Sequence, residues 1–314
     1  MITHPDKVLF PADGITKGDL ARYYEQIAPV MLPHVSGRPL TMERYPAGIE
    51  KKGFIQKDVS KGYPDWLERV ELAKRDGSLW HALLNDTRSL LWATNQNCIT
   101  VHVGSSRVPH LLRPDLCVFD LDPSVQDSAV LERAALSVRD TLAELGLRCW
   151  VKTSGSKGFH IALAMDPETR FESLSLFAHG VGALLVKRNP TQLTQEFLKS
   201  DRQGRILIDT GRNAFSATYA APYTVRARPG APVSAPCTWE EVESGKVSPE
   251  SFKLEDMPAR VAQVGDLWAD LHAAPASLES AMQKLSRLIQ PEEWQLGAGR
   301  LRRKGKPRKP RAAP

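Results

Sequence analysis

The chain has 314 residues, of which 42% are hydrophobic and 25% are charged, a composition typical of globular proteins. No apolar stretch reaches the ~18 residues that a membrane span requires, and the N-terminus lacks the pattern of a signal peptide. We therefore expect a cytoplasmic protein with no membrane partner. The four cysteines are too far apart to indicate a disulfide framework or a zinc site.

The positive net charge of +6 comes from the C-terminus. Residues 300–311 hold eight of the 42 basic residues and no acidic one, which leaves 34 basic against 36 acidic residues elsewhere, a net charge of −2. A segment rich in Gly, Pro, Lys and Arg cannot bury enough apolar surface to fold. We predict a folded domain over residues 1–295 and a disordered basic tail over residues 296–314. The tail either binds polyanions through counterion release or serves only solubility.

The first predicted element is a helix. Thr16 and Asp19 form a capping-box pattern, and apolar residues then recur at helical spacing until Pro29, where we expect the helix to end. Residues 38–57 indicate short strands and turns. Residues 90–103 indicate a short helix that runs into a strand.

From residue 116 onwards, helices and strands alternate. Strands are predicted over residues 116–121, 148–153, 159–165 and 206–209, and helices over residues 127–146 and 171–187. A stretch rich in Arg, Pro and Ala follows, and then a helix capped by Thr238 and two helices around residues 261–271 and 278–289. The sequence therefore predicts a mixed α/β (α+β) fold.

Two carboxylates end one of these strands in the sequence "VFDLDPS", residues 118–124. In a strand Asp120 and Asp122 share a face, with Cα atoms about 6.6–7 Å apart. Without a counterion they would raise each other's pKa, and a divalent metal removes that conflict. Asp209 likewise ends an apolar strand. Three such acids suit a two-metal site for phosphoryl or nucleotidyl transfer. Surface or capping roles, and a phosphatase of the haloacid dehalogenase type, fit "VFDLDPS" equally well.

A candidate anion-binding loop, "SGSKG", covers residues 154–158. Its backbone N–H groups and hydroxyls are expected to be free to surround an anion, and Lys157 adds positive charge. His160 follows on the next strand, where it is in reach of the same phosphates. An ordinary turn is the alternative interpretation.

Three arginines follow the third acid. Arg212 comes first, and Arg226 and Arg228 then alternate as on a strand, so we expect these two to share a face. Such a pair suits a triphosphate or a DNA backbone. Solvated surface arginines are the alternative.

With these motifs in order, the chain resembles the polymerase domain of bacterial DNA ligase D, in the archaeo-eukaryotic primase superfamily. The resemblance runs from Thr3 to about Leu271. Seven motifs carry it: "HPDKVLFPADGITKGDL", "SGRPLTMERYP", "GFIQKD", "VFDLDPS", "KTSGSKGFHI", "DRQGRILIDTGRNA" and "APYTVRARPGAPVSAPCTWEEV". It implies a primase-polymerase fold over residues 1–295, with central mixed or antiparallel sheets flanked by helices.

The resemblance also implies the site residues. Asp120, Asp122 and Asp209 would hold two divalent ions, Mn²⁺ or Mg²⁺, while a primer 3′-hydroxyl attacks the α-phosphate of a nucleotide. The implied nucleotide-binding residues are His102, Ser154, Lys157, Gly158, His160, Arg226, Arg228, Phe54 and Ile55. Lys7 and Lys17 match lysines that bind a DNA 5′-phosphate, and Arg202 matches a position near the template. The family often has a second aromatic residue where this chain has Ile55, which puts stacking on the base at that position in doubt.

We therefore expect a stand-alone, template-directed repair polymerase that fills gaps or extends ends at DNA breaks, in non-homologous end joining or short-gap repair, and favours ribonucleotides. The implied partners are nucleotides and gapped or broken DNA with a 5′-phosphate, together with Ku and a separate ligase. The implied location is the bacterial nucleoid. The alternatives are a non-catalytic DNA-end-binding module and the phosphatase named above, although later motifs of that phosphatase have no clear counterparts here.

Overall fold

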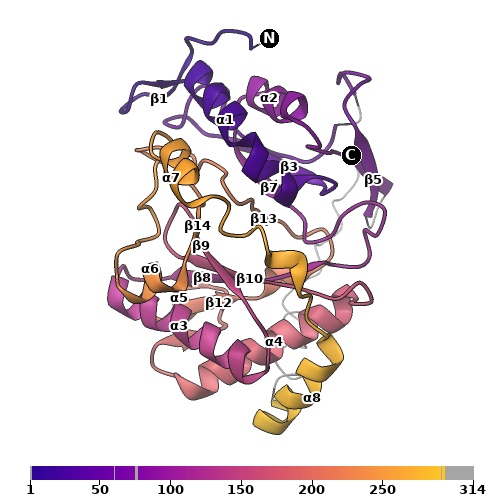
Figure 1. Cartoon of the computed structure of the whole chain (residues 1–314), viewed down its shortest axis with the longest axis vertical. Coiled ribbons are helices and arrows are strands. Elements are labelled where there is room, and N and C mark those ends of the chain that lie inside the picture. The colour runs from indigo at the N-terminus through magenta and orange to yellow at the C-terminus, as the bar shows by residue number, and fades with distance from the viewer. Residues whose placement is uncertain (1, 60, 75–76, 291, 294–314) are drawn as a thin grey trace, which may run out of the picture.

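The structure, a computed structural model, describes residues 2–59, 61–74, 77–290 and 292–293. The predicted tail over residues 296–314 lies outside these ranges. Within them, none of the helices combines the length and apolar character that crossing a membrane demands. The described chain forms two halves, each built around one sheet (Figure 1).

The first half contains a four-stranded antiparallel sheet in the order β13-β7-β3-β4. Its strands are β13 (Tyr219–Ala220), β7 (Cys98–Val103), β3 (Leu40–Arg44) and β4 (Phe54–Gln56). Helices α1 (Lys17–Val35) and α2 (Thr87–Asn95) pack against each other beside this sheet, and α7 (Met257–Val264) contacts α1. Two hairpins lie outside it: β1 (Val8–Phe10) with β2 (Ile15–Thr16), and β5 (Arg69–Lys74) with β6 (Gly77–Ala82).

The second half contains a six-stranded sheet in the order β11-β12-β8-β10-β9-β14, in which only β11 and β12 are parallel neighbours. Its strands are β11 (Leu193–Thr194), β12 (Ile206–Asp209), β8 (Leu116–Pro123), β10 (Phe159–Ala164), β9 (Trp150–Thr153) and β14 (Pro236–Cys237). Helices α3 (Ser128–Glu144) and α4 (Phe171–Arg188) pack beside it, and α8 (Leu278–Leu288) packs on α4. The short helices are α5 (Lys199–Arg202), α6 (Trp239–Glu243), η1 (Gly211–Asn213) and η2 (Leu271–Ala273).

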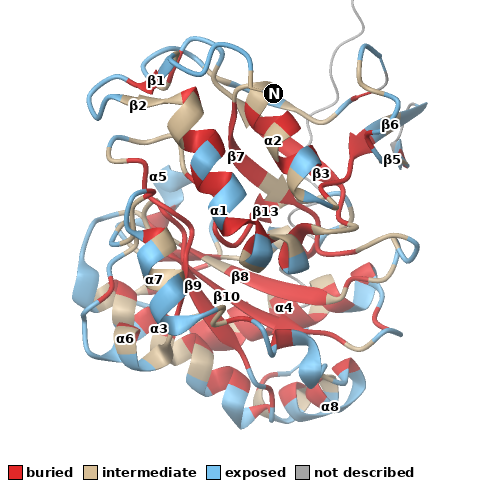
Figure 2. Ribbon diagram, turned by 45° about the horizontal axis from the view of Figure 1, so that its top comes forward, coloured by how far each residue is buried: buried red, intermediate tan, exposed pale blue. Residues whose placement is uncertain are grey.

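The two faces of strand β8 belong to different cores. Cys117, Phe119 and Leu121 pack into the core that holds α3 and α4, whereas Leu116 and Val118 pack into the core of the first half. Figure 2 shows β10 buried beside β8. Because side chains alternate along a strand, Asp120 and Asp122 lie on the face turned away from α3 and α4. The acids therefore face the region between the two sheets.

The mixed α/β fold with sheets flanked by helices is confirmed. The capping boxes at Thr16 and Thr238 form as predicted, and the Asp127 side chain caps α3. The four cysteines are buried and free. These features depend on residues close together in the chain, which explains why the sequence predicts them.

Two helix boundaries differ from the prediction. Helix α1 continues through Pro29 to Val35, because Met31 and Val35 are fully buried and their packing outweighs the hydrogen bond that proline cannot make. The helix expected around residues 261–271 instead covers Met257–Val264. It ends at Gly265, whose φ of +70° reverses the chain.

Candidate active site

The three predicted acids line one pocket of about 320 Å³. Asp209 on β12 lies directly opposite Asp120 on β8, and Asp122 follows two residues later on the same strand. Residues directly opposite in an antiparallel pair point to the same face. The register between β8 and β12 therefore brings the third acid to the other two.

The same register places a row of ionisable side chains across four strands. His160 on β10 lies opposite Asp120, and Lys152 on β9 lies opposite His160. Lys152 is fully buried, and its ammonium donates to the hydroxyl of Ser234. Burial, together with the charge of nearby Arg226, holds the pKa of Lys152 well below its usual range. The row thus runs from two carboxylates through an imidazole to a buried amine.

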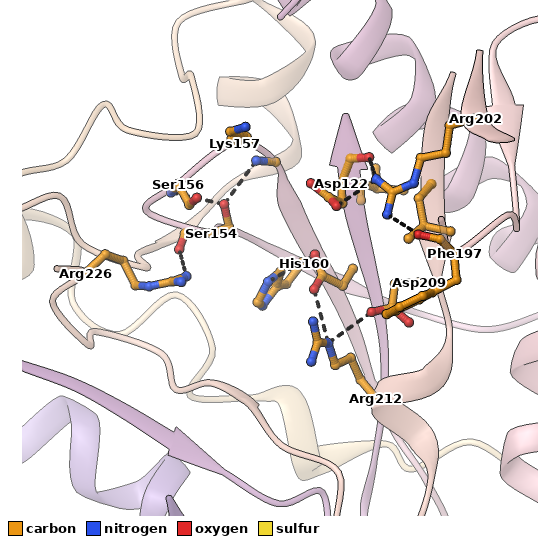
Figure 3. A pocket seen from close by; sticks show the side chains of 14 residues that line it. Asp122, Ser154, Ser156, Lys157, His160, Phe197, Arg202, Asp209, Arg212 and Arg226 are labelled. Atoms are coloured by element: carbon orange, nitrogen blue, oxygen red, sulfur yellow. Dashed lines mark hydrogen bonds and ion pairs between the residues drawn. The ribbon is translucent and has the colours of Figure 1, made fainter. Parts of the chain in front are cut away.

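Arginines lie at all three carboxylates. Arg212 Nε is 3.3 Å from Asp120 Oδ2 and 3.3 Å from Asp209 Oδ2, so it bridges the acids of two strands (Figure 3). Arg202 Nη1 is 2.8 Å from Asp122 Oδ2. The Arg202 side chain is buried, whereas that of Arg212 is 41% exposed. Arg212 is therefore the more easily displaced of the two.

The electrostatics of the paired acids differ. Burial by itself would raise the pKa of Asp120, but His160, Arg212 and Lys152 outweigh it and hold that pKa well below its usual range. For Asp209 burial prevails, and the charges of Asp120 and Asp122 add to it, so its pKa is raised despite Arg212. The expected repulsion between the acids thus contributes to the raised pKa of Asp209. At Asp120 the neighbouring His160, Arg212 and Lys152 lower the pKa instead.

His160 is a buried neutral histidine. Burial, and then the charge of Lys152, lower its pKa to about 4 even though Asp120 favours the charged form. Its Nε2 lies 3.4 Å from Asp120 Oδ1. Its Nδ1 is buried and has no hydrogen-bond partner in the described part of the chain. That nitrogen is available to a bound group.

The three acids are of the chemical type that binds divalent metal ions. Carboxylate oxygens are the donors that Mg²⁺ and Mn²⁺ prefer. In residues 2–59, 61–74, 77–290 and 292–293, however, no three His, Cys, Asp or Glu side chains are grouped closely enough to hold an ion. The guanidinium of Arg212 lies between Asp120 and Asp209, where it balances their charge. A metal that used both carboxylates would have to displace it.

The loop after β9 is folded by its own serine. The Ser154 hydroxyl accepts hydrogen bonds from the backbone N–H groups of Ser156 and Gly158, at 3.1 and 3.0 Å. The expectation that the loop leaves its N–H groups free is therefore wrong for Ser156 and Gly158, because both N–H groups already donate to the Ser154 hydroxyl. Lys157 lines the pocket at the tip of the loop. Its ammonium is the loop's main contribution of positive charge.

Gly158 allows the loop to return against β8. A Cβ atom built on Gly158 would lie 1.7 Å from the carbonyl oxygen of Leu121, far inside van der Waals contact. Only glycine permits this approach. Gly158 thus fixes the distance between the loop and the acid-bearing strand rather than offering a side chain.

The expectation that Arg226 and Arg228 alternate on one strand is wrong. Only Val225 forms an isolated bridge in this segment, and the chain turns directly after it. Arg226 points into the pocket and donates to the Ser154 carbonyl at 2.7 Å, whereas Arg228 lies 3.6 Å from Glu250. The Arg226 Nε is buried without a partner among the residues that the structure describes.

His102 belongs to a second polar cluster beside Arg226. Its Nε2 lies 3.4 Å from Glu43 Oε2, and the Tyr45 hydroxyl donates to Glu43 at 2.7 Å. Burial opposes ionisation of Glu43, but the hydrogen bonds of His102 and Tyr45 prevail and lower its pKa to about 2. Burial lowers the pKa of His102, and the charge of Arg226 lowers it further. The hydrogen bond to Glu43 acts in the opposite direction but does not prevail. Glu43 was not predicted, because its partner is remote in the chain.

Six predicted residues lie outside the pocket lining: His102 and Arg228, described above, and Phe54, Ile55, Lys7 and Lys17. Phe54 and Ile55 on the edge strand β4 are 46% and 56% exposed, and Arg44 lies over the Phe54 ring. The ammonium of Lys17 is buried and donates to the Thr3 carbonyl at 2.9 Å. Burial, and then the charge of Lys7, lower the pKa of Lys17. The backbone N–H of Lys17 donates to the Lys7 carbonyl at 2.8 Å, so the two residues are neighbours.

Arg202 lies at the site with a role that the sequence does not indicate. Besides Asp122, it donates to the backbone carbonyls of Glu196 and Phe197 at 3.2 and 2.9 Å. It therefore ties the segment before α5 to strand β8. Sequence analysis also overlooked Lys152, although a lysine within the apolar strand "WVKT" is a visible signal.

The family model and the similar proteins all point to the same family. The LigD primase-polymerase domain matches residues 16–268. The multifunctional non-homologous end joining DNA repair protein LigD of Mycobacterium tuberculosis is 35% identical over 281 residues, 87% of this chain and 37% of that protein. The LigD of Pseudomonas aeruginosa is 29% identical over 287 residues, 90% of this chain and 34% of that protein. This chain thus spans about a third of each of these relatives.

A solved structure is similar over nearly the same range. It is the polymerase domain of Mycobacterium tuberculosis ligase D in complex with DNA. The TM-score is 0.82 at 34% sequence identity, and the match covers 88% of this chain and 99% of the other.

Proposed function

Because this chain belongs to the LigD primase-polymerase family, we propose that it extends a DNA primer, copying a template, at gaps and breaks in DNA. The chain is a nucleotidyltransferase domain of the primase-polymerase type. The names of its relatives, and the DNA in the similar structure, support DNA as substrate and non-homologous end joining as the pathway. We further propose a preference for ribonucleotides, as implied by the family resemblance.

One observation carries the proposal: three carboxylates and a basic loop line the same pocket. Asp122 and Asp209 lie on one side of it, and Lys157 and Arg226 on the other (Figure 3). Asp120, which is paired with Asp209 across the two strands, lines the same pocket. A site that only binds phosphates gains nothing from carboxylates, which repel them. Acids beside a basic loop suit nucleotidyl transfer, in which metal-bound carboxylates and a phosphate-binding group act together on one phosphate.

In the proposed site Asp120, Asp122 and Asp209 would hold divalent ions, Mn²⁺ or Mg²⁺, which would supply Lewis-acid chemistry for nucleotidyl transfer. Lys157 and Arg226 bind the triphosphate. Two buried nitrogens without partners in the described part of the chain belong to residues that line this pocket. Arg226 Nε can donate to a bound group, whereas Nδ1 of the neutral His160, whose Nε2 lies against Asp120, can accept.

Several residues orient the others. Ser154 holds the loop, and its carbonyl holds Arg226. In this proposal Glu43 orients His102 toward the nucleotide. Phe54 and Ile55 lie near the nucleobase, and Arg228 contributes positive charge at the edge of the site. Arg202 stabilises Asp122 and lies near the template strand.

We propose that Lys7 and Lys17 bind the 5′-phosphate on the far side of a gap. Two close ammonium groups repel each other, and an anion relieves that repulsion. The backbone hydrogen bond between Lys17 and Lys7, which places the two residues side by side, supports such a pairing. We propose Ku and a DNA ligase activity as the partners that break repair by this chain would need.

The direct test is extension of a gapped duplex that carries a 5′-phosphate, with Mn²⁺ and ribo- or deoxyribonucleotides in parallel. The wild-type chain is expected to add a templated nucleotide. Asp120→Asn keeps the shape but removes the charge, so we expect at least a ~100-fold lower rate. The matched control is Asp140→Asn, since the Asp140 carboxylate is 66% exposed and lies outside the pocket.

Three outcomes separate this proposal from its alternatives. Full incorporation by Asp120→Asn would contradict the mechanism. End binding that is indifferent to metal and nucleotide, without extension, would favour the non-catalytic end-binding module. A duplex with a 5′-hydroxyl in place of the 5′-phosphate should bind more weakly, and Lys7→Ala should abolish that difference.

A further inference from the structure

Phe197 is an exposed aromatic residue at the candidate active site. Its side chain is 67% exposed, compared with 46% for Phe54, 39% for Trp80 and 36% for Trp66. It lines the same pocket as the three acids. Leaving an aromatic ring in water forgoes the free energy of burying it, which makes an exposed ring inside a functional pocket a candidate contact for a ligand.

The backbone of Phe197 is held although its ring is free. Arg202 Nη2 donates to the Phe197 carbonyl at 2.9 Å, Nε donates to the Glu196 carbonyl at 3.2 Å, and Nη1 binds Asp122. Arg202 itself is buried. The main chain of Phe197 is therefore held beside the acids, while its ring is largely exposed.

The position of the ring indicates which ligand group it meets. Figure 3 shows Phe197 on the side of Asp122 and Asp209, while Ser154, Lys157 and Arg226 lie on the opposite side. In phosphoryl transfer the attacking and leaving oxygens are roughly in line. If the triphosphate lies against Lys157 and Arg226, the attacking hydroxyl approaches from the side of Phe197.

The chemistry near the ring also favours a base over a phosphate. Asp122 and Asp209 repel anions, and the phenyl ring carries no charge. Base stacking on an aromatic ring tolerates any sequence, as a polymerase requires. We propose that the Phe197 ring stacks on the terminal base of the primer, and so positions the 3′-hydroxyl. This inference rests on the proposed function.

The test uses the full chain and a gapped duplex with 2-aminopurine as the 3′-terminal base of the primer. Stacking on Phe197 is expected to change the fluorescence of that base when wild-type protein binds, before any nucleotide is added. Phe197→Ala should abolish the change and weaken binding of the primer end by about 5- to 100-fold. Phe197→Trp keeps a ring and should retain both. The KM for the nucleotide should stay constant in all variants.

Leu198→Ala is the matched control, because Leu198 is the next residue and is 52% exposed. An equal loss in this variant would mean a general apolar contact and would overturn the proposal. So would unchanged fluorescence and affinity in Phe197→Ala, or an effect confined to the nucleotide KM. Extension by the wild-type chain on the same duplex reports on the proposed polymerase function separately, so the two failures are distinguishable.

Discussion

At the scale of single residues, the candidate site is a balance of buried charges. Three carboxylates share one pocket, and two arginines compensate them. Arg212 is half-exposed and bridges two strands, whereas Arg202 is buried and fixed by backbone carbonyls. A buried charge without a partner costs several kcal/mol. The arginines thus offset part of the cost of burying the carboxylates.

His160 makes the stability of the chain dependent on pH. Its pKa is about 4 in the folded chain and 6.5 is the ordinary value, so the unfolded chain takes up a proton first as the pH falls below about 6.5. Stability is therefore lost between pH 6.5 and 4. His160→Gln should reduce the loss between pH 7 and pH 5 by about 1–2 kcal/mol, measured by urea unfolding at both pH values.

The control for this prediction is His110→Gln, at an exposed histidine. We expect its pH dependence to match that of the wild-type chain. If His160→Gln also lost as much stability as the wild-type chain on going to pH 5, His160 would not be held neutral by its surroundings. The structural explanation for its low pKa would then be wrong.

At the scale of elements, the register between neighbouring strands creates the site. β8 carries two acids, β12 supplies the third and β10 supplies His160, all on one face. A shift of one residue in either pairing would turn the incoming side chain to the opposite face. The close return of the 154–158 loop depends on the same pairing, through Gly158 and Leu121.

Gly158→Ala tests that close approach. The added methyl would meet the Leu121 carbonyl at 1.7 Å, so β8 and the loop must separate. We expect the free energy of unfolding to fall by about 2–3 kcal/mol, measured by urea unfolding. Gly104→Ala is the control, because its nearest neighbour would be an ordinary 3.8 Å away. Equal stability of the two variants would show that the loop does not depend on Gly158.

At the scale of the whole molecule, positive charge is unevenly distributed along the chain. Eight basic residues lie within residues 300–311, and the rest of the chain has more acidic than basic residues. Long-range attraction to DNA therefore comes mainly from the C-terminal segment. In the proposed site, local arrangements such as Lys157 with Arg226 would then determine where phosphates bind.

Removing residues 296–314 should lower the affinity for DNA. It should also reduce the dependence of that affinity on salt concentration. Each phosphate contact contributes about 0.9 to the slope of log affinity against log salt, so losing up to eight charges should reduce the slope by about 3–7. Fluorescence anisotropy across a salt series measures it. Replacing the eight Lys and Arg residues by Gln in the full chain should have the same effect. An unchanged slope would mean that the segment serves only solubility.

The sequence by itself determined which residues end the acid-bearing strands, which of them share a face and where the main helices are capped. These features follow from the periodicity and spacing of neighbouring residues. The motif order was also sufficient for the family, which the comparisons confirm. The end of α1 could not be predicted, because packing of Met31 and Val35 overrides the local preference of Pro29.

Only the tertiary structure decided the partners of the charged groups. Arg212 meets Asp120 across 92 residues of chain, and Arg202 meets Asp122 across 80. Such pairings depend on strand register and on packing between distant segments, which local sequence patterns do not encode. The loop hydrogen bonds of Ser154 are local, since they join residues two and four apart, but residue type alone does not specify the turn that forms them. Periodicity specifies the face of each side chain, but folding specifies what it meets.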